Sequence, residues 1–63
     1  MSEANAINSA FEEHVGVLFK GFVTNLGDAS ASHKTDQQCL DAFTTGLNVA
    51  RKAKQMALTV TSA

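Results

Sequence analysis

The most chemically suggestive residues of this sequence are a cluster of hydroxyl and basic side chains near its middle. Ser30, Ser32, His33, Lys34 and Thr35 follow one another closely, and Thr35 is placed to start a helix. Free N–H groups and the positive end of the dipole at a helix N-terminus favour anions. The cluster therefore predicts a site for a phosphate-containing ligand. The alternative is an ordinary solvated turn whose Ser and Thr side chains cap the helix.

The other candidate groups favour neither catalysis nor a metal. Glu12, Glu13 and His14 are consecutive, so on a helix they point in different directions and cannot converge as ferritin-like ligands do. Cys39 is the single cysteine, which excludes an internal disulfide and, with two separated histidines, gives no zinc pattern. The glycine spacing matches no phosphate-binding loop. We therefore expect a non-catalytic protein with no cofactor and no metal.

Length and composition restrict the class of protein further. The chain has 63 residues, a net charge of -1, 17% charged residues and 44% hydrophobic residues. The balanced charge argues against duplex nucleic-acid binding, and the hydrophobic content argues against disorder. The sequence has no apolar run long enough for a transmembrane helix, and its start, MSEANAIN, lacks the features of a signal peptide. One cytoplasmic domain without membrane contact is expected.

The absence of proline and a helical apolar spacing predict two helices. The first is expected over about residues 2–26, capped either by Ser2 or by Ser9, which forms a capping-box pattern with Glu12. Gly27 is expected to end it as a left-handed residue, followed by a turn over 27–34. Its apolar stripe consists of Ile7, Phe11, Val15, Leu18, Phe22 and Leu26.

The second helix is expected over about residues 35–60, with Thr35 and Gln38 as its capping box. It carries two apolar seams. The seam expected to face the first helix contains Leu40, Phe43, Leu47, Ala50, Lys54 and Ala57. The second seam follows a heptad pattern and is rich in small residues, which let a neighbouring backbone approach closely; it contains Cys39, Ala42, Gly46, Val49, Ala53, Met56 and Val60.

The size of the chain favours self-association. One short hairpin without a disulfide, a metal or a tryptophan buries too little apolar surface to be stable alone. The second seam would also be left exposed on a monomer. We therefore predict an all-α fold, a two-helix antiparallel hairpin over residues 1–63 that assembles into a homo-oligomeric helical bundle through this seam.

The stretch from Phe19 to Leu58 also resembles a known family. It contains a helix, a Ser-rich turn ending in a basic residue, and a helix with the pattern Gln38-Cys-Leu-Asp-Ala-Phe-x-x-Gly-Leu-x-x-Ala-x-x-Ala53. This arrangement is similar to the helical hairpin of small phage proteins that sequester cyclic nucleotide signals and so block the CBASS and Thoeris antiphage defences. The resemblance implies a compact helical oligomer without enzymatic activity that holds its ligand between protomers.

Two functions remain open on this basis. The resemblance favours a phage-type sponge for a signalling nucleotide, whose phosphate would be held by Ser32, His33, Lys34 and Thr35 together with Lys20 or Arg51 of a neighbouring protomer. The alternative is a protein–protein adaptor or inhibitor that docks a partner helix on its apolar face. A sponge should show a ligand-dependent rise in melting temperature, whereas an adaptor should not.

Overall fold

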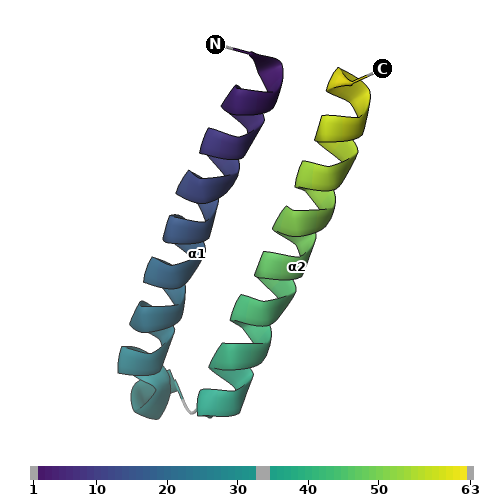
Figure 1. The fold of residues 1–63 in the computed structure, drawn as a ribbon. Helices are drawn as coiled ribbons and strands as arrows, with labels where there is room; N and C mark the ends of the chain where they lie inside the picture. The colour runs from purple at the N-terminus through teal and green to yellow at the C-terminus, as the bar shows by residue number, and fades with distance from the viewer. Residues whose placement is uncertain (1, 33–34, 63) are drawn as a thin grey trace.

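The computed structural model describes residues 2–32 and 35–62, and the side chains of 2–28 and 35–62. It consists of two helices, α1 (Glu3–Ser32) and α2 (Asp36–Thr61). The helices lie side by side and run in opposite directions, so that both ends of the chain lie at the same end of the molecule (Figure 1). The predicted all-α hairpin is confirmed.

Both helices begin at side-chain caps. The Ser2 hydroxyl accepts a hydrogen bond of 3.0 Å from the Asn5 N–H. In α2, the Thr35 hydroxyl accepts from the Gln38 backbone N–H at 3.1 Å, and the Gln38 side-chain oxygen Oε1 accepts from the Thr35 backbone N–H at 2.8 Å. These bonds satisfy donors that a helix N-terminus otherwise leaves unpaired. The capping box at Thr35 is confirmed, and the first helix begins after Ser2, so that Ser9 lies inside it.

The first helix is longer than predicted. It continues through Gly27 to Ser32, so the predicted end at residue 26 is wrong, as is the part of the predicted turn over 27–32. Gly27 is not left-handed, and a Cβ there would meet nothing within 4 Å. One glycine costs a helix only about 1 kcal/mol, and the alanines and the absence of proline after it favour continuation. Ser30 and Ser32 therefore belong to the last turns of α1, whereas His33 and Lys34 lie outside the described residues.

The surface of α1 that contacts α2 has heptad spacing. Half-buried residues recur at intervals that alternate between four and three positions: Ala4, Asn8, Phe11, Val15, Leu18, Phe22 and Asn25. This spacing keeps one seam of a helix against its neighbour along the whole length. The predicted apolar stripe is thus confirmed except for its last member, Leu26, which is 38% exposed.

Two ring contacts fix the register of the hairpin. Near the connection, the Phe22 and Phe43 rings stack with their centroids 5.0 Å apart and their planes 22° from parallel. Nearer the chain termini, the Lys54 ammonium lies 4.5 Å from the centroid of the Phe11 ring. A residue late in α1 thus contacts a residue early in α2, and a residue early in α1 contacts one late in α2, as an antiparallel arrangement requires.

The surface of α2 that faces α1 lies between the two predicted seams. Cys39 is 1% exposed and Ala50 is 9% exposed, and a Cβ on Gly46 would lie only 2.9 Å from Cδ2 of Leu18. Cys39 and Gly46 therefore pack inside the hairpin, which corrects their assignment to the subunit seam. Leu40, expected to face α1, is 43% exposed. The physical reason for this orientation of α2 is complementarity of size, because Gly46, which has no side chain, leaves room for the bulky side chain of Leu18.

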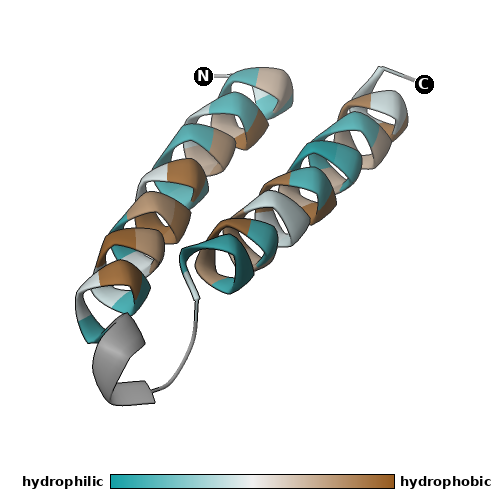
Figure 2. Cartoon of the chain, turned by 90° about the horizontal axis from the view of Figure 1, so that it is seen from below, coloured by the Kyte–Doolittle hydropathy of each residue, from teal (hydrophilic) through white to brown (hydrophobic). Residues whose placement is uncertain are grey.

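A single layer of two helices leaves many apolar side chains accessible. The hairpin measures 47 × 18 × 10 Å, with a radius of gyration of 14.6 Å, whereas a compact domain of this length has about 11 Å. Hydrophobic residues recur along both helices (Figure 2). The large apolar side chains exposed among the described residues are Val17, Phe19, Val23, Leu26, Leu40, Val49, Met56 and Val60.

Candidate binding surface

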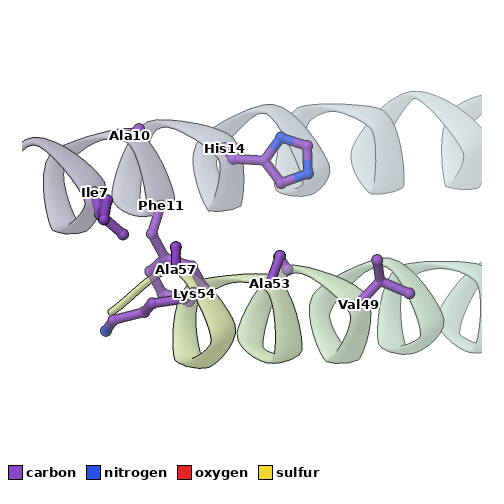
Figure 3. A pocket seen from close by; sticks show the side chains of 9 residues that line it. Ile7, Ala10, Phe11, His14, Val49, Ala53, Lys54 and Ala57 are labelled. Atoms are coloured by element: carbon purple, nitrogen blue, oxygen red, sulfur yellow. The ribbon is translucent and has the colours of Figure 1, made fainter. Parts of the chain in front are cut away.

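The larger of two cavities lies between the helices, in the half of the hairpin nearer the chain termini. Its volume is about 340 Å³. Ile7 and Phe11 project from α1 toward α2, while Ala53 and Val49 project from α2 toward α1 (Figure 3). The lining is almost entirely apolar: Ile7, Ala10, Phe11, His14, Val49, Ala50, Ala53, Lys54 and Ala57.

Two polar side chains border this cavity. The Lys54 side chain is half-buried beside the Phe11 ring, a cation–π contact of about 0.5–1 kcal/mol at an exposed site. His14 is exposed on α1. The lining offers no hydroxyl, thiol or carboxylate, so Lys54 and His14 are its polar side chains. This cavity can bind an apolar group and can place a cation or an imidazole beside it.

The smaller cavity, of about 170 Å³, lies nearer the connection between the helices. It is lined by Val17, Leu18, Gly21, Phe22, Asn25, Ala42 and Phe43. On α1, Val17 and Gly21 continue the three-and-four spacing of Ala10 and His14, which border the larger cavity. Both cavities therefore open on the same face of the hairpin.

The structure does not assemble the predicted anion site in the part that it describes. Ser30 and Ser32 lie in the last turns of α1, where unpaired carbonyl groups and the negative end of the dipole disfavour an anion. His33 and Lys34 lie outside the described residues. Thr35 is described, and its hydroxyl accepts a hydrogen bond from the Gln38 N–H as the cap of α2.

The two more distant basic residues of the predicted site lie on different helices. Lys20 falls midway between Leu18 and Phe22, which contact α2, so it is exposed on the outer side of α1. Arg51 is exposed on α2, where its guanidinium donates to Asn48 Oδ1 at 3.5 Å. One hairpin does not bring these two cations together. That a neighbouring subunit supplies Lys20 or Arg51 to a site near the connection stays a prediction.

Sequence reasoning missed the larger cavity. It noted that Lys54 projects into an apolar seam, but it did not pair Lys54 with Phe11 or bring His14 to the same surface. The available signal was the spacing of three between Phe11 and His14, which places them near each other on α1. Their partners on α2 depend on the register between the helices. Five members of the predicted subunit seam remain exposed: Ala42, Val49, Ala53, Met56 and Val60.

Over the described ranges, no three His, Cys, Asp or Glu side chains come together as a metal site would need. Neither helix has, within those ranges, the length and hydropathy required to cross a bilayer. Comparisons with models of protein families, with curated proteins and with solved structures give no match to this chain. The resemblance to phage sponge proteins stays a prediction.

Proposed function

We propose that this protein is a non-catalytic helical binding module that acts as a homo-oligomer. The observation that supports this proposal is the surface area of the single hairpin, 4725 Å². A folded monomer of 6.6 kDa exposes about 3,900 Å² by the scaling of surface with mass. The hairpin therefore exposes roughly 800 Å² more than expected, which is similar to the area that each partner buries in a standard protein interface.

The burial pattern supports the same conclusion. Among the described residues, Cys39 and Ala50 are the buried apolar residues, and both are small. Larger side chains such as Val49 and Met56 are 63% and 61% exposed. Because apolar burial is the dominant favourable term in folding, a hairpin with so small a core gains most of its stability from a partner that covers these side chains.

Native mass spectrometry together with sedimentation equilibrium tests this proposal. We expect a species of two or more protomers at micromolar concentration. Its melting temperature should rise with protein concentration, because subunit association stabilises the folded state by mass action. A species of one protomer throughout this range, with a melting temperature independent of concentration, would contradict the proposal.

A second function, adaptor or inhibitor, is favoured by apolar residues away from the two cavities. Phe19, Val23 and Leu26 share one stripe of α1 by their spacing of four and three, and they are 55%, 51% and 38% exposed. Leu40 of α2 is also exposed. These four residues form the outer apolar patch, whose chemistry suits the apolar side of an amphipathic partner helix.

A photoreactive amino acid at Val23, introduced into the protein in its host cells, tests the adaptor function. We expect one partner protein to be cross-linked from Val23 and not from Lys20, which is exposed one turn away. Equal products from both positions would show contact without specificity and would contradict the adaptor function.

The sponge function is supported by the resemblance alone. Calorimetric titration with cyclic dinucleotides, cyclic trinucleotides and cyclic ADP-ribose isomers tests it. Binding to the wild type should weaken at least tenfold in Lys34→Glu, because a charge-assisted hydrogen bond contributes about 1.5–3 kcal/mol. Absence of heat and of a melting shift with every ligand would leave the adaptor function as the stronger candidate.

A further inference from the structure

One face of the hairpin has the properties of a self-complementary interface. On α1, a stripe with steps of three and four contains Ile7, Ala10, His14, Val17 and Gly21. On α2, the matching stripe contains Ala42, Val49, Ala53, Met56 and Val60. Members of both stripes line the larger cavity and the smaller cavity. These two stripes and the cavities between them form the grooved face.

The two stripes of the grooved face carry no formal charge, and the one cation at its cavities is Lys54, which borders the larger one. None of the ten stripe residues is Asp, Glu, Lys or Arg, and His14 is the one titratable side chain among them. The stripes on the other face carry charges, because Glu12 shares the stripe of Phe19 and Val23 on α1, and Arg51 shares that of Leu40 on α2. Charged residues are depleted at the centre of protein interfaces. The grooved face is therefore the better candidate for complete burial.

Projections and hollows occur together on this face. Val17, Val49, Met56 and Val60 are 57%, 63%, 61% and 75% exposed, and Val17 and Val49 also border the cavities of about 170 and 340 Å³, respectively. In a two-fold symmetric interface the same patch must supply both the projecting side chains and the spaces that receive them. Small neighbours, Ala10, Gly21, Ala42 and Ala53, let the backbones of two subunits approach.

We propose that the grooved face binds a second copy of this chain across a two-fold axis and so completes a four-helix bundle. Val17, Val49 and Met56 of each protomer then fill the cavities of the other. One hairpin is 18 × 10 Å in cross-section, and packed helices lie about 8–10 Å apart. Two stacked hairpins thus give the nearly square section of such a bundle. This assignment rests on the proposed homo-oligomer and leaves the outer apolar patch accessible to a partner protein.

Matched substitutions distinguish the two faces. Val49→Glu introduces a carboxylate on the grooved face, and Val23→Glu introduces the same group on the outer apolar patch at similar exposure, 63% against 51%. Burying an unpaired charge on each protomer should raise the dimer dissociation constant at least ~100-fold for Val49→Glu. Val23→Glu should change it by less than about threefold, as surface substitutions do. Sedimentation equilibrium measures both constants.

Isotope-filtered nuclear Overhauser spectra of a mixed labelled and unlabelled dimer test the assignment without a substitution. We expect intermolecular contacts from the methyl groups of Val17, Val49 and Met56. Intermolecular contacts from Val23 and Leu40 instead would overturn the assignment, as would a dimer that Val23→Glu weakens and Val49→Glu does not. A wild type that is a monomer would overturn the homo-oligomer itself, so the two failures are distinguishable.

Discussion

The close approach of Gly46 to Leu18 gives a prediction whose magnitude can be worked from the structure. An alanine Cβ at position 46 would lie 2.9 Å from Leu18 Cδ2, and 3.8 and 3.9 Å from its Cδ1 and Cγ. Favourable carbon–carbon contacts begin near 3.5 Å, so Cδ2 has to move. Because Cδ2 is the end of a half-buried flexible side chain, the displacement should cost about 0.5–1.5 kcal/mol.

Replacement of glycine by alanine inside a helix gains about 1 kcal/mol. For Gly46→Ala this gain and the displacement of Leu18 should nearly cancel, and the free energy of unfolding should change little. Gly16 is the matched control, because it lies inside α1 and a Cβ there meets nothing within 4 Å. Gly16→Ala should therefore stabilise the protein by the full amount, about 1 kcal/mol.

A double-mutant cycle isolates the contact. Leu18→Val removes both Cδ atoms, so Gly46→Ala in that background should recover its gain and give a coupling energy of about 1 kcal/mol. Urea unfolding followed by circular dichroism, at one protomer concentration, supplies the four free energies. Equal stabilisation by Gly46→Ala and Gly16→Ala, with no coupling to Leu18, would refute the packing of Gly46 inside the hairpin.

Three further substitutions test local features. Gly27→Ala should stabilise the protein by about 1 kcal/mol, because the helix continues through this residue; a loss of stability would indicate a left-handed helix end instead. Thr35→Ala should lower the free energy of unfolding by about 1 kcal/mol, because it removes the cap of α2. Thr44→Ala, at an exposed interior position of the same helix, should not lower it. Similar losses of stability at both sites would contradict a capping role for Thr35. Lys54→Met should lower the free energy of unfolding by about 0.5–1 kcal/mol more in the wild type than in a Phe11→Leu protein, because only the wild type has an aromatic ring beside the ammonium. Equal changes in both proteins, measured by urea unfolding, would exclude an interaction between Lys54 and the ring.

The sequence by itself determined that the chain forms two helices and that Thr35 caps the second. The apolar period of Phe11, Val15 and Leu18 and the capping box at Thr35 are local signals, because each depends on residues within one or two helical turns. The end of α1 was predicted wrongly, because Gly27 is compatible with both a helix interior and a left-handed end. Whether the helix continues or ends at Gly27 depends on small differences in the helix propensity of the residues that follow it.

The tertiary structure alone decided which side of α2 is covered. α2 has apolar residues over a wide arc, and periodicity does not say which part of that arc faces α1. The fit of Gly46 to Leu18 and the stacking of Phe22 on Phe43 select it. That rotation places Cys39 and Gly46 inside the hairpin and leaves the other five members of the predicted subunit seam exposed. The two cavities likewise depend on the antiparallel register, because their walls come from residues that are far apart in the sequence and adjacent only after the helices pack.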